Sequence, residues 1–220
     1  MNPHPAFIFD MDGVIVDSNP FHKIALKQFC EKYGHHLTEE DLVKRIYGRR
    51  NEDWLKNIFG PLDPDQLNRY ADEKEALFRE LYDGEIEPVA GLAGFLEQLD
   101  ELGIQRVIAT SAPRANVDFT LVKTGTVKYF QIILDSSHVR HGKPDPEVYL
   151  KAAGAVQARP ENCVVFEDSL AGVEAARGAG CKVVGITTTH SAAELRQTDL
   201  VIDNFAGIDP RQVIQRLFGS

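Results

Sequence analysis

The sequence predicts an α/β protein, with a Rossmann-like, doubly wound parallel sheet as the core and an inserted α-helical cap domain. Short runs rich in valine and isoleucine recur without alternating apolar and polar residues, as strands buried on both faces do. Helical stretches separate these runs, which is typical of parallel strands joined by crossover helices. The insertion is predicted because the segment from Asp17 to about Glu87 contains no convincing strand pattern.

Six runs are the expected strands of the sheet. They are AFIF (6–9), QRVIAT (105–110), QIIL (131–134), CVVFED (163–168), KVVGI (182–186) and LVI (200–202). The stretches between them carry helix signals. GLAGFLEQLDELG stops at Gly103, and DPEVYLKAAGA has Pro146 in its first turn. SLAGVEAARGAG begins at Ser169, a common N-cap residue, and Asn116 is the expected N-cap of VDFTLVKTG.

The insertion after the first strand is interpreted as helical. Three stretches have helical patterns: NPFHKIALKQFCEKYG, TEEDLVKRIYG and DPDQLNRYADEKEALFRELYDG. The second has acidic residues in its first turn, which suit the helix dipole. The expected division is a Rossmann-like catalytic core of residues 1–16 and 88–220 and a helical cap domain of residues 17–87. Asp17 and Glu87 mark the two expected hinges.

Composition narrows the classes of function. The formal net charge of −9 argues against nucleic-acid binding through a broad basic face. Lys44, Arg45, Arg49 and Arg50 form a local basic cluster, which suits a solvated surface as well as a binding loop. No apolar run reaches the roughly 18 residues of a membrane helix, and no signal peptide is expected. Three cysteines without a C-x-x-C pair favour a reducing compartment, so we expect a cytoplasmic protein. The oligomeric state is left open, and a monomer is compatible with the sequence.

Polar side chains follow four of the expected strands. In open parallel sheets ligands bind at the carboxyl ends of the strands, so these side chains are expected to meet. They are Asp10 and Asp12 after the first strand, Thr110 and Ser111 after the second, Lys143 in GKPDP after the third, and Glu167 and Asp168 at the end of the fourth. Two carboxylates about 4 Å apart repel by ~4 kcal/mol at an effective dielectric of 20. Protonation, a lysine or a bound cation would relieve this cost. Oxygen ligands without histidine or cysteine suit Mg²⁺ better than zinc.

The same residue types can transfer a phosphoryl group. Such a transfer needs an aligned nucleophile and neutralised charge, and a carboxylate can be that nucleophile. A second carboxyl group can protonate the leaving oxygen and later deprotonate water. Asp10 and Asp12 supply both groups from one turn, and Gly13 would allow a sharp bend and a close approach to the ligand.

Four motifs, in order along the chain, resemble those of the haloacid dehalogenase superfamily. DMDGVIVDS, ATS, GKPDP and FEDSLAGVEAARGAG are similar to its four motifs, and the helical insertion resembles its small cap. The resemblance implies that Asp10 is the nucleophile and a Mg²⁺ ligand. It also implies that Asp12 is the general acid/base, with its backbone carbonyl on the metal.

The resemblance implies roles for the other three strand ends as well. Thr110 and the Ser111 amide would hold the phosphoryl group, and Lys143 would steady the nucleophile and the phosphoryl oxygens. Asp168 would complete the metal site. Glu167 would either bind the metal directly or act one contact away from it.

Within that superfamily, the β-phosphoglucomutase-like branch is nearest in pattern. DSNPFHKIALKQF resembles the start of its cap, including Ser18 and His22, although His22 could instead cap or pack the first cap helix. YGRRNED falls where that branch carries its substrate-specificity loop. The residues expected to bind substrate are Ser111, His22, Arg49, Arg50, Asn51 and Arg114.

The sequence departs from the mutase pattern at cationic positions. Tyr47 and Asn51 stand where the mutase has lysine and arginine, and Pro113 and Arg114 replace a lysine and an asparagine. A mutase must hold a bisphosphate in two orientations, so the loss of cations weakens that interpretation. Nearby arginines could partly compensate.

Three functions follow in order of preference. The first is a Mg²⁺-dependent phosphatase that hydrolyses a small phosphorylated metabolite, such as a sugar phosphate, through an aspartyl-phosphate. The second is a phosphomutase with the same core. The third is a receiver-type signalling domain, which shares the carboxylates, hydroxyl and lysine but is shorter and has no helical insertion. The expected partner is a small phosphorylated molecule, with no nucleic acid and no membrane.

Overall fold

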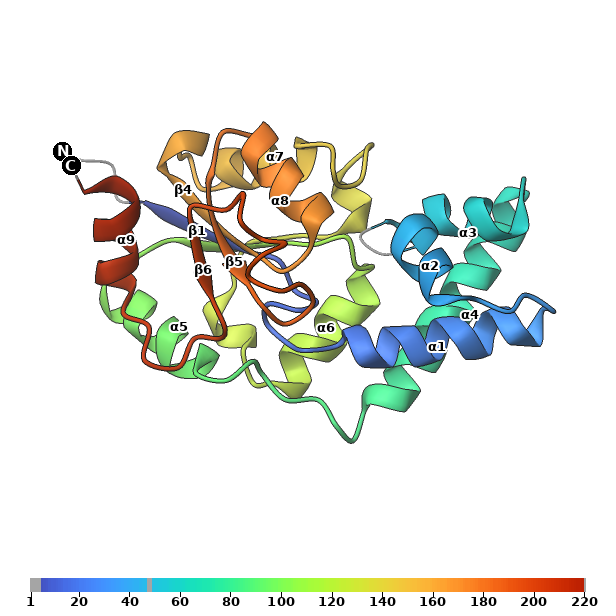
Figure 1. The fold of residues 1–220 in the computed structure, drawn as a ribbon. Helices are drawn as coiled ribbons and strands as arrows, with labels where there is room; N and C mark the ends of the chain where they lie inside the picture. Colours follow the sequence, from blue (N-terminus) through green and yellow to red (C-terminus); the bar gives the residue numbers. More distant parts are fainter. Residues whose placement is uncertain (1–4, 47–48, 220) are drawn as a thin grey trace.

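The computed structural model describes residues 5–46 and 49–219, with six parallel strands in one sheet at its centre (Figure 1). The strand order is β3-β2-β1-β4-β5-β6. The strands are β1 (Ala6–Phe9), β2 (Arg106–Ala109), β3 (Ile133–Leu134), β4 (Cys163–Glu167), β5 (Lys182–Ile186) and β6 (Leu200–Ile202). The predicted fold class is confirmed, and each strand lies within its predicted run.

Helices cover both faces of the sheet. They are α5 (Leu92–Glu101), α6 (Arg114–Lys123), α7 (Glu147–Ala155), α8 (Leu170–Gly178) and α9 (Pro210–Phe218). Helices α5, α6 and α9 share one hydrophobic cluster with one face of β1, and α7 and α8 share another with the opposite face. Among the described residues, no helix combines the length and the apolar character needed to cross a membrane.

The central strand β1 is buried on both faces, and this sets its register. Phe7 and Phe9 point into one hydrophobic cluster and Ile8 into the other, because side chains alternate along a strand. The Phe9 ring stacks on Phe166 of β4, with centroids 4.9 Å apart and planes 8° apart. Phe9 and Phe166 are also register partners, so the residues after them, Asp10 and Glu167, emerge side by side.

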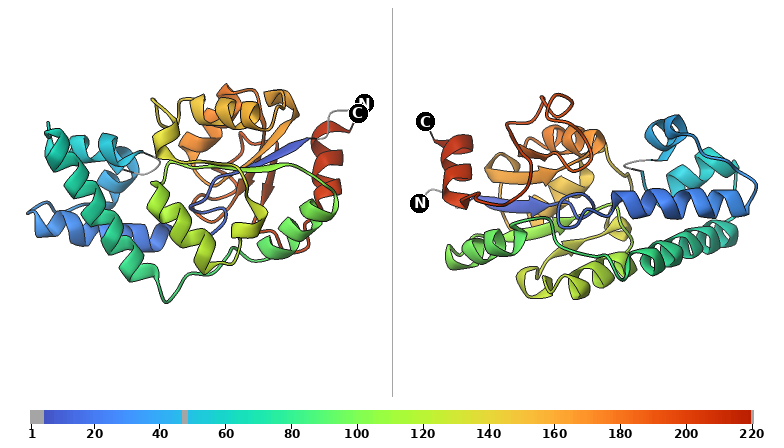
Figure 2. Two further views of the ribbon diagram at one scale, coloured as in Figure 1. Left: turned by 180° about the vertical axis from the view of Figure 1, so that it is seen from behind. Right: turned by 60° about the horizontal axis from the view of Figure 1, so that its bottom comes forward.

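A helical block lies beyond the carboxyl end of β1, apart from the sheet (Figures 1 and 2). It consists of α1 (Asn19–Lys32), α2 (Glu39–Asp41), the π-helix η1 (Leu42–Ile46), α3 (Asn51–Phe59) and α4 (Pro64–Tyr82). Its own hydrophobic cluster is centred on Phe29, Trp54 and Leu55. Tyr47 and Gly48 of the expected specificity loop, and the Lys44 side chain, lie outside the described residues.

One helix prediction in this block is only partly met. TEEDLVKRIYG was expected to form one helix, but α2 passes into the π-helix η1 after Asp41. Thr38 starts α2 with a capping box, because its side chain accepts from the Asp41 backbone while the Asp41 carboxylate accepts from the Thr38 backbone. The wider turn of η1 places both Leu42 and Ile46 in the hydrophobic cluster of the block.

Candidate active site

The strand order creates a crevice at the carboxyl end of β1. Chain connections leave β1 toward β2 on one side and return to β4 on the other, and ligands bind in open α/β sheets at such a reversal. A cavity of about 770 Å³ lies there, lined by residues of the sheet edge and of the helical block. The predicted site residues that line it are Asp10, Asp12, His22, Arg49, Asn51, Thr110, Ser111, Lys143 and Asp168.

Three buried carboxylates share one lysine at this sheet edge. One oxygen of each of Asp10, Glu167 and Asp168 lies within 4.8 Å of the others. Lys143 Nζ lies 3.0 Å from Asp10 Oδ1 and 2.5 Å from Glu167 Oε1, and its side chain is 3% exposed. The cluster therefore carries more negative than positive charge when all its groups are ionised.

Burial and neighbouring negative charge raise the pKa values of two carboxyl groups in the cluster. Burial raises the pKa of Asp10 to about 7; Lys143 opposes this rise, and the Glu167 carboxylate adds to it. Burial, followed by the charges of Glu167 and Asp10, raises the pKa of Asp168 well above its ordinary value. Asp10 Oδ1 is buried without a hydrogen-bond partner of good geometry. A hard divalent cation fits this donor set, because it would let both carboxylates ionise.

Glu167 has both of its oxygens engaged. Oε1 accepts from Lys143 Nζ at 2.5 Å and from Tyr149 Oη at 2.6 Å. Oε2 accepts from the backbone amides of Asp168 and Ser169 and from the Ser169 hydroxyl, at 3.0 to 3.1 Å. Burial opposes its ionisation, but Lys143 outweighs this and keeps the pKa of Glu167 lowered. Of the two roles left open for Glu167, this geometry favours positioning its neighbours over direct contact with a metal.

Gly13 lies in the turn that follows Asp12 and packs close to Asp168. Its φ of +77° is in the left-handed region, which favours glycine. A Cβ built on Gly13 would overlap the Asp168 carboxylate. The backbone after Asp12 can therefore approach Asp168 closely only because position 13 has no side chain.

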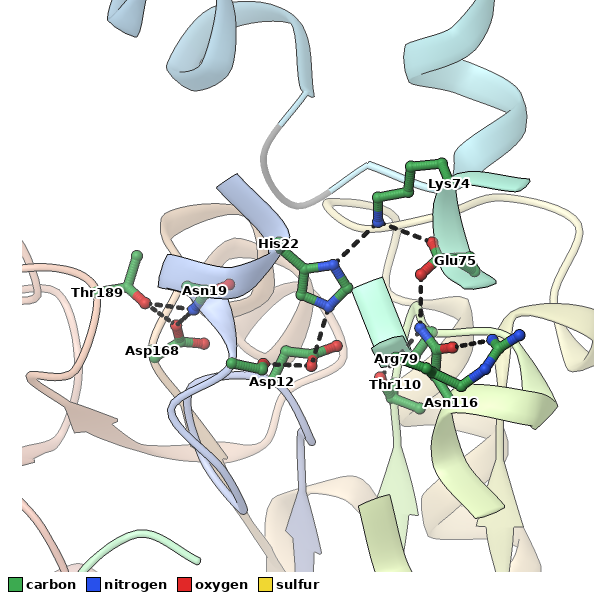
Figure 3. Close-up of polar contacts among 12 residues, drawn as sticks. Asp12, Asn19, His22, Lys74, Glu75, Arg79, Thr110, Asn116, Asp168 and Thr189 are labelled. Carbon is green, nitrogen blue, oxygen red and sulfur yellow. Dashed lines mark hydrogen bonds and ion pairs between the residues drawn. The ribbon is translucent and has the colours of Figure 1, made fainter. Parts of the chain in front are cut away.

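Two further side chains hold Asp168. Its Oδ2 accepts from Asn19 Nδ2 at 3.1 Å and from the Thr189 hydroxyl, and Asn19 also donates to Thr189 Oγ1 at 2.7 Å (Figure 3). Asn19 is the first residue of α1, and Thr189 lies in the loop after β5. The orientation of Asp168 is therefore coupled to the start of the helical block.

Asp12 faces His22 of the helical block. Its Oδ1 accepts from Ser18 Oγ at 2.5 Å and lies 3.4 Å from His22 Nε2 (Figure 3). The His22 ring stacks on Phe78 at 3.6 Å, and its Nδ1 lies 2.9 Å from Lys74 Nζ. An ammonium group can only donate, so Nδ1 accepts and the ring proton resides on Nε2, toward Asp12. Burial opposes ionisation of Asp12, but His22, Ser18 and Lys74 together outweigh it and lower the pKa of Asp12.

A row of polar contacts continues from Lys74 to the core. Lys74 Nζ lies 2.9 Å from Glu75 Oε1, which also accepts from Asn51 Nδ2 at 2.9 Å. Glu75 Oε2 accepts from Asn116 Nδ2 at 2.6 Å, and Arg79 donates to Asn116 Oδ1 at 2.6 Å. Figure 3 shows this row passing from α4 to α6, which links the helical block to the core.

Two residues predicted to contact the substrate, Arg50 and Arg114, are not among the residues that line the cavity. The Arg50 side chain pairs with Asp53 at 3.2 Å and is not among the cavity-lining residues. Arg114 is exposed and pairs with Asp118 at 2.8 Å, one turn along α6. Both arginines therefore have surface partners within their own segment.

The interpretation of Asn116 as an N-cap is wrong. Helix α6 begins at Arg114 with Pro113 as its N-cap, so Asn116 lies inside the first turn. The Asn116 side chain is buried and bonds across to α4. Proline at 113 starts the helix earlier than the predicted cap would.

Lys74 and Glu75 were not found from the sequence. The pattern of DPDQLNRYADEKEALFRELYDG predicts a long helix but assigns no role to these two charged residues. A helical projection would have shown the conflict, because Lys74 lies four residues before the buried Phe78 and Glu75 lies three before it. Asn19 and Thr189 carried no comparable signal, since nothing in their local pattern marks proximity to Asp168.

The chain is similar to known proteins in sequence and in fold. Residues 7–186 match the family described as haloacid dehalogenase-like hydrolase. A phosphorylated carbohydrates phosphatase of Thermotoga maritima is 37% identical over 180 residues, which cover 80% of this chain and 81% of that protein. A β-phosphoglucomutase of Bacillus subtilis is 30% identical over 191 residues, covering 82% of each chain. The crystal structure of a family IA, variant 3 hydrolase from Entamoeba histolytica superposes with a TM-score of 0.87 at 29% identity, covering 97% of this chain and 99% of that one.

Proposed function

The chain belongs to the haloacid dehalogenase-like hydrolase family, and from this premise we propose that it is a Mg²⁺-dependent phosphatase of small phosphorylated carbohydrates that works through an aspartyl-phosphate on Asp10. Its relatives include named phosphatases, and the chain is an enzyme of the phosphate-monoester hydrolase class. The buried cluster of Asp10, Glu167 and Asp168 around Lys143 is the observation that carries the proposal.

The residues proposed to hold Mg²⁺ are Asp10, Asp168 and the backbone carbonyl of Asp12. The raised pKa values of Asp10 and Asp168 support this role, because a cation would favour their ionised forms. When bound, the ion would offset the charge of the carboxylates and of the substrate phosphate. Glu167 would act indirectly, by fixing Lys143 and the backbone of Asp168.

Asp10 would attack phosphorus, and Asp12 would manage the protons. The leaving alcohol oxygen would take a proton from Asp12, and Asp12 would later accept a proton from the water that hydrolyses the aspartyl-phosphate. Its lowered pKa suits the second step. An anionic phosphate that enters beside Asp12 would raise that pKa and favour the protonated form needed for the first step.

The phosphoryl oxygens would be held by three groups at the cavity floor. Thr110 and Ser111 follow β2, and both line the cavity. Lys143 Nζ lies 3.0 Å from Asp10 Oδ1, and its ammonium group could share its charge with a phosphoryl oxygen. Positioning and neutralised charge account for most of the catalysis in phosphoryl transfer.

The test is hydrolysis of 4-nitrophenyl phosphate by wild type and by Asp10→Asn. We expect wild type to be active with Mg²⁺ and inactive with excess EDTA, and Asp10→Asn to lose at least about 10³-fold of kcat while keeping its circular-dichroism spectrum. Asp118→Asn, an exposed carboxylate on α6, is the control and should keep wild-type activity. Full activity of Asp10→Asn would exclude Asp10 as the nucleophile.

A phosphomutase is the second candidate, because the chain is 30% identical to a β-phosphoglucomutase. Arg50 and Arg114 do not line the cavity and pair with Asp53 and Asp118, which weighs against it, since a mutase must also hold the phosphate that does not react. Incubation with glucose 1-phosphate and a bisphosphate primer separates the two. Isomer formation without free phosphate would favour the mutase.

A further inference from the structure

The helical block contributes a buried ion pair to the cavity wall. The side chains of Lys74 and Glu75 line the cavity yet are only 4% and 7% exposed, and they meet at 2.9 Å. Burial opposes ionisation of Glu75, but Lys74 and then His22 outweigh it and keep its pKa lowered. Glu75 is therefore an anion that neutralises the nearest ammonium group.

Glu75 also occupies the amide donors around it. Asn51 Nδ2 and Asn116 Nδ2 both donate to its carboxylate, at 2.9 Å and 2.6 Å. These amides would otherwise be suitable donors to an anionic ligand group. Asn51 is one of the positions where the mutase pattern has a cation.

The other charges of the block leave little positive potential for a second anion. The cavity-lining residues of segment 17–87 include three cations, Lys23, Arg49 and Lys74, and three acids, Asp17, Glu39 and Glu75. Lys23 pairs with Glu39 at 2.7 Å, and Lys74 pairs with Glu75 at 2.9 Å. Loss of the Glu75 charge would leave Lys74 buried and unmatched by its neighbour on α4.

We propose that Glu75 is a specificity-determining residue, which limits the substrate to phosphate monoesters whose opposite end is uncharged and hydroxylated. It does so by cancelling the charge of Lys74 and by engaging the amides of Asn51 and Asn116, so that a distal phosphate or carboxylate finds no receptor at these three residues. This inference rests on the proposed phosphatase function and adds the chemistry of the substrate end that does not react.

The first test needs only the wild-type enzyme. D-Glucitol 6-phosphate and 6-phosphogluconate have the same carbon chain and differ at the far end, which is a hydroxymethyl group in one and a carboxylate in the other. We expect kcat/KM to be at least about ten-fold higher for D-glucitol 6-phosphate. Equal values, or a preference for 6-phosphogluconate, would overturn the inference.

The second test assigns the discrimination to Glu75. Glu75→Gln keeps the size of the side chain but removes its charge and replaces one acceptor oxygen by a donor NH2 group. It should reduce the ratio of the two kcat/KM values at least about five-fold. Glu73→Gln on the same helix removes a carboxylate that pairs with Lys32, and it should keep the wild-type ratio. An unchanged ratio in folded Glu75→Gln, or an equal loss in both variants, would overturn the assignment. If Glu75→Gln does not fold, the wild-type ratio still decides.

Hydrolysis of 4-nitrophenyl phosphate distinguishes failure of the phosphatase proposal from failure of the proposed substrate class. If the wild type hydrolyses none of the three substrates, the phosphatase function itself fails. Hydrolysis of the aryl phosphate without hydrolysis of either six-carbon phosphate would overturn only the substrate class inferred here.

Discussion

Gly13 is a residue at which a single added methyl group should disturb the active site. Gly13→Ala would combine an unfavourable left-handed backbone with an overlap on the Asp168 carboxylate. We expect the variant to lose more than 2 kcal/mol of unfolding free energy, on the order of the cost of strain plus overpacking. Urea unfolding measures the stability. Activity measured at increasing Mg²⁺ concentrations should show that the variant needs more Mg²⁺ than wild type to reach half of its maximal activity.

Gly34 provides the matched control for that prediction. Its φ of +81° is similar, but no atom lies within 4 Å of the Cβ that an alanine would add. Gly34→Ala should therefore lose only about 1 kcal/mol, the cost of the backbone conformation, and leave Mg²⁺ dependence unchanged. Equal effects at both positions would contradict the role of Gly13 in admitting Asp168.

The raised pKa of Asp10 predicts a specific pH dependence of metal-free stability. Below its ordinary pKa of 3.8 the carboxyl group is protonated in both folded and unfolded states, so it costs nothing. Between 3.8 and about 7 only the unfolded chain releases the proton, so stability falls as pH rises. In EDTA, wild type should become less stable than Asp10→Asn by up to ~4 kcal/mol at pH 7 and above.

Two measurements check this dependence. Urea unfolding of both proteins from pH 4 to pH 8 gives the difference in stability, which should be near its minimum at pH 4. Saturating Mg²⁺ should reduce the difference at pH 7, because the ion favours the ionised carboxylate that Asp10→Asn lacks. A difference that does not vary with pH would contradict the assignment.

At the scale of elements, the N-cap of α8 has a second role at the active site. Ser169 Oγ accepts from the Gly172 amide at 3.1 Å and donates to Glu167 Oε2 at 3.0 Å. Ser169→Ala should cost about 1 kcal/mol of stability as a lost cap, and several-fold in kcat because Glu167 would hold Lys143 less firmly. Chemical denaturation and steady-state kinetics measure the two effects.

The cap of α4 separates these effects. Asp63 accepts from the Gln66 amide at 2.8 Å, and it is not among the cavity-lining residues. Asp63→Ala should lose a similar stability of about 1 kcal/mol but retain kcat. If both variants retain kcat, the proposed link from Ser169 to the active site is wrong.

The sequence predicts those elements whose pattern lies within their own residues, and it does not predict features that depend on contacts with distant residues. AFIF and CVVFED are recognisable as strands because strands buried on both faces need continuous apolar residues. The carboxylates after these runs are expected at one edge of the sheet because parallel strands end at the same edge. The start of α6 was misplaced because Asn116 and Pro113 both favour helix starts, and only the packing against α4 shows which one acts. The π-helix η1 had no signal, since its spacing serves a hydrophobic cluster formed by distant residues.

At the scale of the whole molecule, the contacts between helical block and core should govern access to the cavity. Arg79 on α4 donates to Asn116 on α6, beside the bond from Asn116 to Glu75. We expect Arg79→Met to favour a more open arrangement and to raise KM about three- to ten-fold, with a smaller change in kcat. Small-angle scattering should show a larger radius of gyration for the variant.

The control for that prediction lies on the same helix. Arg69 is exposed and rests over the Tyr70 ring at 5.5 Å, within the helical block. Arg69→Met should leave both KM and the radius of gyration at wild-type values. The contact of Arg79 with Asn116 could not be predicted from the sequence. It joins the helical block to the core, and no local pattern shows how these two parts pack together.

The position of β1 in the sheet has a consequence for biosynthesis. Phe7 pairs with Arg106 on one side and with Val164 on the other, so β1 gains its neighbours only from segments that are translated much later. Until then the nascent chain carries an apolar strand with two open edges, which is a hazard for misassociation. Such high contact order implies slow folding, and chains truncated before β4 should depend on chaperones to remain unaggregated.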